Sequence, residues 1–289
     1  MWWLALAALV DWAPVERLLN AGQYAAALAR LEQVEERQAP WHVLASKAYD
    51  GLNQPARAVS EAEAALALEP RNQAAHVQLG SIFLSHHTPA AALEIFSEAQ
   101  ALFPESLLVR LGKGLALKEL QRYDEAEREL AACWPNPVAF DAQATVYLHS
   151  FQFAKAKDLA AKFIAIHPED YRGYYYRAAA LDALEEAGAR EAISESLRRK
   201  PDFAASYALL GKILLREGKP DEAAKALEQA IRYRPDLTQA HLQLAQAYRR
   251  LGRGEEAARE FAIVQKLNQA PPPPSLRYHR GNRPAPLQK

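Results

Sequence analysis

The sequence predicts an all-α fold of tandem helix-turn-helix units, and three observations support it. The β-branched residues that sheets favour are scarce: Thr, Ile and Val number 3, 8 and 10 among 289 residues. Prolines recur 34 residues apart, from Pro70 to Pro104 and from Pro201 to Pro235. Small residues keep the same phase between the prolines: Leu79-Gly80, Leu210-Gly211 and Leu244-Ala245 at one place, and Ala92, Ala126, Ala223 and Ala257 at another. Such a period indicates a repeat made of two helices.

Each unit is expected to hold a helix A, a turn and a helix B. Gly80, Gly211 and the small Ala245 allow helix A to approach helix B, because a larger side chain would push the backbones apart. Larger apolar residues then fill the space between the helices: Phe83, Phe96, Leu214 and Leu227. Proline after helix B cannot continue the hydrogen-bond ladder and ends the unit. The sequence therefore divides into eight units, the first degenerate: 8–38, 39–72, 73–106, 107–136, 137–170, 171–203, 204–237 and 238–271.

Two units are shorter than the rest. Unit 107–136 lacks four residues, and unit 171–203 lacks one, which we assign to its turn at residues 185–188. Because a shortened unit changes the rotation between its neighbours, we expect the array to kink at these places.

The order Leu-Gly, Ala and Pro within about 34 residues resembles the tetratricopeptide repeat (TPR) family over residues 8–271, most clearly in residues 204–237. The resemblance implies a right-handed α-solenoid, or superhelix, whose A helices line a concave groove. It also implies a protein that binds other proteins and is not an enzyme. The alanine-rich, TPR-only format is similar to bacterial assembly or envelope proteins of this family.

The same resemblance assigns side chains to a peptide-binding groove. They are apolar and aromatic in the centre and basic toward the C-terminus: Val77, Leu84, Leu108, Leu111, Leu115, Leu148, Arg172, Tyr175, Tyr176, Lys212, Arg216 and Arg249. Tyrosine and arginine are the residue types that carry much of the binding energy at interfaces. For Tyr175 and Tyr176, packing between repeats is an equally good interpretation.

The chain is expected to have three parts: an apolar segment 1–10, the TPR array 11–270 and a tail 271–289. Residues 1–10 are too few to span a bilayer, which takes about 20. They are interpreted either as an export-signal remnant or as a helix that caps the first repeat. We favour the first, and hence an exported or periplasmic location over a cytoplasmic one. The tail begins with four prolines and contains no acidic residue, which predicts a disordered basic segment that is either a solvated end or a docking segment.

The last predicted helix leads directly into the prolines, so no further helix covers it. Its apolar residues Ile263, Val264 and Leu267 are therefore candidates for self-association. The alternative is that the tail folds back over them.

Residue patterns typical of catalysis are not found. The 35 Lys and Arg balance 35 Asp and Glu, which is not the charge of a nucleic-acid-binding protein. His42, His76 and His241 occupy a helix A position at which packing is expected, and Cys133 is expected to be a buried thiol. There is no glycine-rich phosphate loop, so no catalytic, cofactor-binding or metal-binding residue is assigned. The sequence favours a scaffold for protein–protein interaction. The alternatives are a self-assembling protein joined through its C-terminal helix and an accessory or regulatory subunit of an enzyme.

Overall fold

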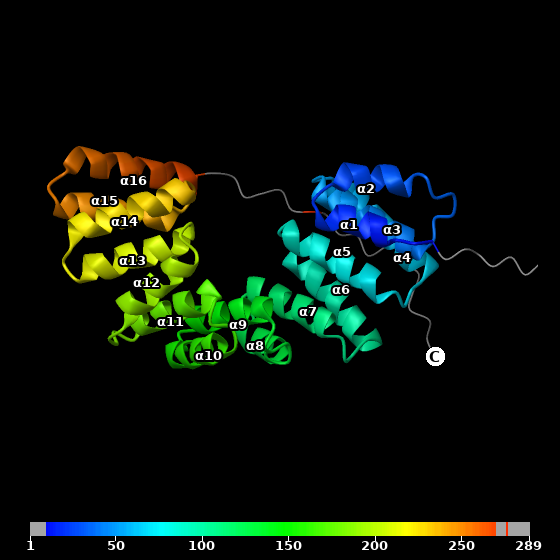
Figure 1. The fold of residues 1–289 in the computed structure, drawn as a ribbon, viewed down its shortest axis with the longest axis horizontal. Coiled ribbons are helices and arrows are strands. Elements are labelled where there is room, and N and C mark those ends of the chain that lie inside the picture. Colours follow the sequence, from blue (N-terminus) through cyan, green and yellow to red (C-terminus); the bar gives the residue numbers. More distant parts are fainter. Residues whose placement is uncertain (1–9, 270–275, 277–289) are drawn as a thin grey trace, which may run out of the picture. The chain divides into compact units, whose positions relative to one another are not determined.

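The computed structural model describes residues 10–269 and residue 276, and this part of the chain is an all-α helical-repeat solenoid without strands (Figure 1). Its sixteen helices form eight successive hairpins. The first four pair α1 (Ala13–Asn20) with α2 (Tyr24–Leu31), α3 (Ala39–Gly51) with α4 (Pro55–Leu68), α5 (Gln73–Ser85) with α6 (Pro89–Leu102), and α7 (Leu107–Glu119) with α8 (Tyr123–Ala131). The last four pair α9 (Pro137–His149) with α10 (Phe153–Ile166), α11 (Tyr171–Ala183) with α12 (Ala189–Arg199), α13 (Ala204–Arg216) with α14 (Pro220–Tyr233), and α15 (Thr238–Arg250) with α16 (Gly254–Asn268).

The chain divides into two compact units, with the boundary between Ala132 and Cys133. The N-terminal unit contains α1–α8 together with Leu276, and the C-terminal unit contains α9–α16. The boundary lies inside unit 107–136, the most shortened of the predicted repeats.

Within each unit the two kinds of helix pack differently. Each helix B except the last of each unit, α8 and α16, packs between its own helix A and the helix A that follows. Successive A helices also contact one another, as α3, α5 and α7 do, and as α9, α11, α13 and α15 do. Successive B helices make no such contacts in the described residues. The A helices therefore form the inner, more tightly packed face of each unit, and the B helices form its outer face.

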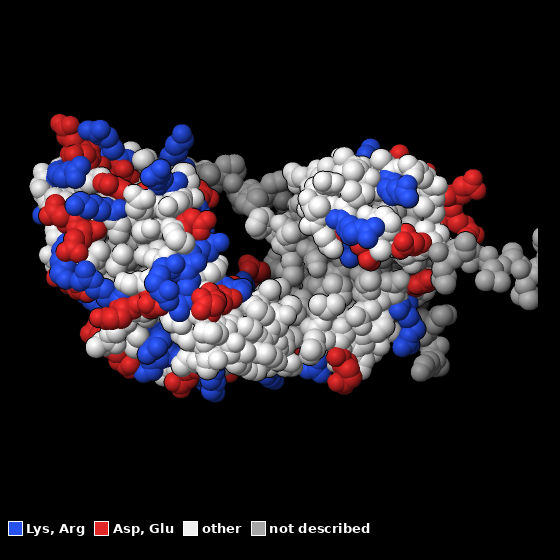
Figure 2. Space-filling model, viewed as in Figure 1, with Lys and Arg blue, Asp and Glu red and all other residues white. Residues whose placement is uncertain are grey.

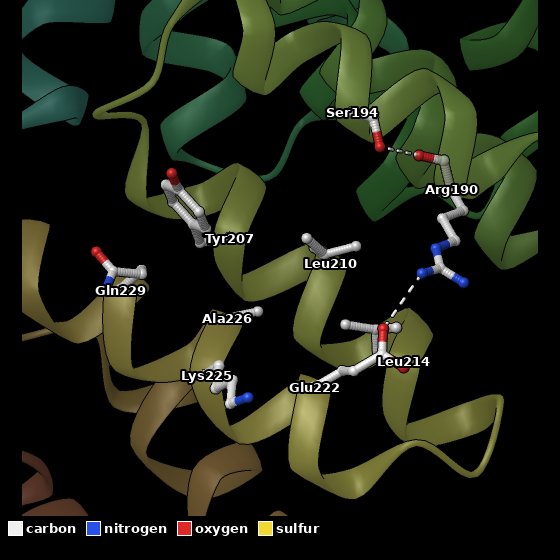
Figure 3. Close-up of a pocket in the computed structure, with 9 residues that line it drawn as sticks. All are labelled: Arg190, Ser194, Tyr207, Leu210, Leu214, Glu222, Lys225, Ala226 and Gln229. Atoms are coloured by element: carbon white, nitrogen blue, oxygen red, sulfur yellow. Dashed lines mark hydrogen bonds and ion pairs between the residues drawn. The ribbon is translucent and has the colours of Figure 1, made fainter.

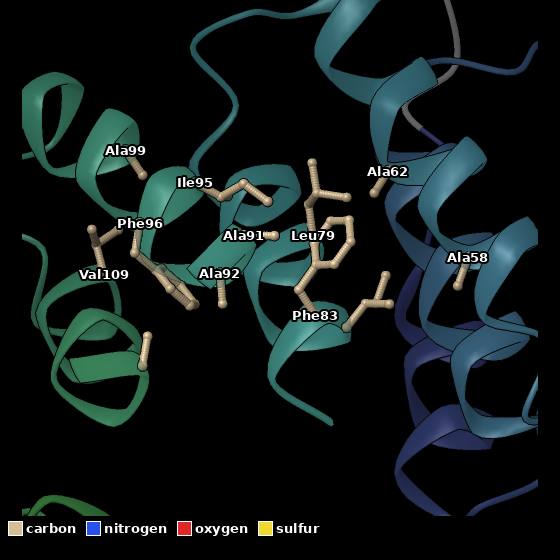
Figure 4. Close-up of a cluster of buried hydrophobic side chains, with 12 residues drawn as sticks. Ala58, Ala62, Leu79, Phe83, Ala91, Ala92, Ile95, Phe96, Ala99 and Val109 are labelled. Carbon is tan, nitrogen blue, oxygen red and sulfur yellow. The ribbon is translucent and has the colours of Figure 1, made fainter. Parts of the chain in front are cut away.

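The core of the N-terminal unit shows why small residues recur in the sequence (Figure 4). Phe96 on α6 is fully buried between Gly80 of its own hairpin and Gly112 of the next. A Cβ atom at Gly80 would lie 2.6 Å from a ring carbon of Phe96, and one at Gly112 would lie 2.2 Å from another. Gly211 has the same relation to Leu227 in the C-terminal unit, with a Cβ-to-Cγ distance of 2.4 Å. The predicted close approach of the helices is confirmed.

The shortened repeats lose their residues from helix B. Helix α8 has 9 residues and α12 has 11, whereas α6 and α14 have 14. The prediction that unit 171–203 lost a residue from its turn is wrong, because its turn spans 184–188 whereas the turn between α5 and α6 spans only 86–88. The longer turn bends at Gly188, which has a φ of 94° and precedes α12.

The predictions for both ends of the chain fall almost entirely outside the described residues. This applies to the export or capping interpretation of residues 1–10, of which only Val10 is described, and to the expected disorder of the tail 271–289. Leu276 is the described residue of that tail.

Candidate functional site

The apolar residues predicted to face a groove in the N-terminal unit lie on two A helices, α5 and α7. We call these residues the apolar strip: Val77, Leu84, Leu108, Leu111 and Leu115. Leu108 is 58% exposed and the other four are half-buried. Val77 and Leu84 pack against the core cluster of this unit, so Leu108 is the member of the strip with most of its side chain in solvent. A row of uncovered leucines on adjacent rigid helices can bind an apolar segment of a partner.

A second feature of this face lies beside α1 and α3. A pocket of about 170 Å³ is formed there by Trp12, Pro40, Val43, Leu44 and Lys47 together with residues of α1 and of the start of α5. It is large enough for a small apolar side chain, and its lining includes one acidic and one basic residue, Glu16 and Lys47. The inner face therefore offers a hollow as well as the strip.

The inner face of the C-terminal unit is built differently, because its aromatic residues join neighbouring repeats. Tyr176 is 6% exposed, and its ring packs edge-on against Phe140 with the ring centres 5.5 Å apart. Its hydroxyl donates a hydrogen bond to Asp141 Oδ1 at 2.9 Å and lies 2.9 Å from the hydroxyl of Thr145. Burial and the nearby Asp141 carboxylate raise the pKa of Tyr176. Tyr176 thus connects α11 to α9 rather than presenting its ring to solvent.

Tyr175 takes part in the same aromatic cluster. Its ring lies 5.1 Å from that of Tyr176 and 5.3 Å from that of Phe203, both edge-on, and burial raises its pKa. The side chain is half-buried. Leu148 on α9 is also half-buried and packs against the same group of residues.

The predicted basic side chains of this unit are largely paired with acids. Asp182 is 3% exposed, and its carboxylate lies 2.9 Å from Lys212 Nζ and 2.7 Å from an Arg216 guanidinium nitrogen. Arg172 donates hydrogen bonds to Asp170 and to the carbonyl oxygen of Pro137. Although partial burial opposes it, the hydrogen bonds from Arg172 lower the pKa of Asp170. Lys212 and Arg216 thus connect α13 to α11, and Arg172 connects α11 to the start of α9.

On the face of the C-terminal unit that Figure 2 shows, positive and negative side chains are interspersed. Arg249 is exposed on α15, whereas its neighbour Arg250 donates a hydrogen bond to the carbonyl oxygen of Leu215.

The outer face of the C-terminal unit has a pocket of about 360 Å³ that sequence reasoning missed (Figure 3). Its floor consists of Tyr207, Leu210 and Leu214 of α13, and its rim includes Arg190 of α12, which lies 3.3 Å from Glu222 of α14. The pocket opens where two B helices separate over the helix A between them. Its residues occupy ordinary positions of the repeat, so the sequence contained no pattern that predicted the pocket.

The apolar residues predicted for self-association lie on the outer part of α16. Ile263 is 36% exposed, and Val264 and Leu267 are half-buried. Among the described residues no further helix follows α16.

The three histidines predicted to pack, His42, His76 and His241, are half-buried or buried. His241 is 3% exposed; its ring nitrogens lie 2.6 Å from Glu260 Oε2 and 2.8 Å from the carbonyl oxygen of Pro235. His42 makes the equivalent contact with Glu61 at 2.7 Å, and Cys133 is buried. Among residues 10–269 and 276, no three His, Cys, Asp or Glu side chains are arranged to hold a metal ion. In the same residues no helix has the length and apolar character needed to cross a membrane.

Comparison with protein families identifies the class of repeat. A sequence model of the tetratricopeptide repeat matches residues 43–106, 86–136 and 209–271, which together make up more than half of the chain. The chain therefore belongs to the tetratricopeptide repeat family, as its spacing of Leu-Gly, Ala and Pro predicted. No curated protein matches its sequence.

Several solved structures have a similar fold. A tetratricopeptide repeat protein from Parabacteroides merdae superposes with a TM-score of 0.66 at 16% identity, and the match covers 82% of this chain and 96% of that one. The anaphase-promoting-complex hetero-tetramer Cut9–Hcn1 superposes with a TM-score of 0.67 at 16% identity, and the match covers 81% of this chain and 48% of that one. A thermophilic TPR protein of Thermus thermophilus superposes with a TM-score of 0.50 at 22% identity, and the match covers 56% of this chain and 91% of that one. At these identities the similarity shows the fold alone.

Proposed function

We propose that this protein is a non-enzymatic scaffold, each of whose two units binds a segment of a partner protein on its inner, helix A face. The apolar strip of the N-terminal unit anchors apolar side chains of the partner. The exposed parts of Lys212, Arg216 and Arg249 in the C-terminal unit select for charge. One similar structure, Cut9–Hcn1, is itself a complex of proteins, which supports a binding role for this fold.

The observation that carries the proposal is the 58% exposure of Leu108 among the half-buried side chains of the apolar strip. Burying a leucine that is otherwise in water contributes about 1.5–3 kcal/mol. Its leucines stand on helices already fixed by the core, so the scaffold loses little conformational entropy when a partner binds. An extended or helical segment with apolar residues at regular spacing fits such a surface.

Selection from a displayed peptide library tests this proposal. The full chain should enrich a common apolar motif, and Leu108→Asp should lose the selected peptides. The matched control is Leu68→Asp, since Leu68 is 56% exposed, close to the 58% of Leu108, but lies on α4, a B helix. Equal binding by both variants would rule out the apolar strip as the site.

Self-assembly is the second candidate function, favoured by the 36% exposure of Ile263 on the last described helix. If α16 joins copies of the chain, light scattering should show an assembly for the full chain and a monomer for Ile263→Asp with Leu267→Asp. A wild-type chain that is monomeric at high concentration excludes this function.

A further inference from the structure

The described residue of the C-terminal tail contacts the N-terminal unit. The backbone N–H of Leu276 donates a hydrogen bond to Thr88 Oγ1 at 3.1 Å, and its carbonyl oxygen lies 3.4 Å from the same hydroxyl. Thr88 stands in the turn between α5 and α6, 188 residues earlier in the chain. One side chain of the repeat thus contacts both backbone polar groups of a distant residue.

The hydroxyl of Thr88 can accept from Leu276 while it donates its own proton elsewhere. That proton has two acceptors, the carbonyl oxygen of His86 at 3.1 Å and that of Leu276 at 3.4 Å. The shorter contact takes the larger share of the donation. The hydrogen bond that Thr88 Oγ1 accepts from Leu276 N–H is therefore the main polar contact. Donation from the Thr88 hydroxyl to the carbonyl oxygen of Leu276 adds to it part of the time.

The side chain of Leu276 adds an apolar contact. It is half-buried and packs against the central core cluster of the N-terminal unit, which includes Phe83 and Phe96. Val77 and Leu84 of the apolar strip border the same cluster. The side chain of Leu276 is thus an apolar anchor of the kind that fits the apolar strip, and the Thr88 hydroxyl holds its backbone.

Charge favours the same pairing. Residues 1–132 contain 17 Asp and Glu against 11 Lys and Arg, a net charge of −6. Residues 270–289 contain four Lys and Arg and no acid, a net charge of +4. Opposite net charges steer the tail toward this unit, with a strength that salt reduces.

We propose that the C-terminal segment around Leu276 is an intramolecular ligand of the N-terminal unit, docked at the α5–α6 turn beside the apolar strip. One leucine and one or two hydrogen bonds bind weakly between separate molecules. A tether raises the effective concentration of such a ligand to about the millimolar range, at which weak contacts suffice. An incoming partner must displace the tail to use the whole inner face. The docking itself does not depend on the proposed scaffold function; only this competition does.

Tryptic cleavage after Arg277 tests the docking in the full chain. Thr88→Val removes both hydrogen bonds at nearly constant shape and should speed this cleavage about tenfold, while Thr88→Ser keeps the hydroxyl and should restore protection. Thr88 makes no side-chain cap for α6, so the substitution leaves that helix start intact. Equal cleavage rates in wild type and Thr88→Val would overturn the proposal. Protection that increases with protein concentration would assign the contact to a second copy and would also overturn it.

A labelled synthetic peptide of residues 270–289 provides the second test. Wild-type protein, with its site filled, should bind the peptide at least about tenfold more weakly than the full-chain variant Leu276→Asp, whose own tail is released. Leu287→Asp places the same charge elsewhere in the tail and should behave as wild type. Equal affinity for wild type and Leu276→Asp contradicts an occupied site. Because neither readout uses a partner protein, they can succeed even if the peptide-library selection fails.

Discussion

The two units use the same hairpin but employ their inner faces differently. In the N-terminal unit, small residues such as Gly80 and Gly112 let the core hold the repeats together, and the apolar strip stays partly exposed. In the C-terminal unit, Tyr176 and Asp182 occupy inner positions and join one repeat to the next. A repeat position that faces the groove is thus available to a ligand only where residues at other positions hold the neighbouring repeats together.

The largest effect is expected from removing the ring that joins two hairpins of the N-terminal unit. Phe96→Ala should lower the free energy of unfolding by about 3–5 kcal/mol, because it empties the space between Gly80 and Gly112. Hydrogen exchange should increase across α5–α7 and stay unchanged across α13–α15. Equal loosening of both regions would show that the two units do not unfold separately.

A smaller loss of stability is expected from adding a side-chain atom to the same space instead of removing the ring from it. Gly112→Ala puts a Cβ atom 2.2 Å from the buried ring of Phe96 and should cost about 1–3 kcal/mol in denaturant unfolding. Gly211→Ala should cost less, because the side chain of Leu227 can change its rotamer more easily than a ring enclosed on both sides can move. Gly218→Ala is the control, since a Cβ there meets no atom within 4 Å and only its φ of 75° opposes the change. A greater loss at Gly211 than at Gly112 would contradict the enclosed ring.

Hydrogen bonding in the C-terminal unit gives the third comparison. Tyr176→Phe keeps the ring but removes the hydroxyl that contacts Asp141 and Thr145, so a loss of about 1–2 kcal/mol in thermal unfolding is expected. Peptides selected on the N-terminal strip should still bind. Unchanged stability together with lost binding would instead make Tyr176 a ligand-contacting residue.

How far the sequence predicted this molecule depends on whether a feature repeats. The 34-residue spacing located the hairpins and the close approach at Gly80 and Gly211, because packing within a repeat is local. The partners of Lys212 and Arg216 were not predicted, since Asp182 belongs to the preceding repeat and nothing in the period marks its charge. The contact between Leu276 and Thr88 could not be inferred, because it joins residues 188 positions apart.

The smallest effect concerns alkaline pH and is confined to the C-terminal unit. Burial and a 2.9 Å hydrogen bond to Glu228 raise the pKa of Tyr248 to about 12, against about 10 for an unfolded tyrosine. The folded chain therefore keeps this proton where the unfolded chain has lost it. The resulting stabilisation is complete below about pH 10 and disappears as the pH rises through about 12. In helicity measurements and tyrosinate absorbance, Tyr248→Phe should show a shallower fall in stability than wild type across this range. Parallel curves for the two proteins would show that other groups cause the alkaline sensitivity and that the α14–α15 contact does not hold this proton.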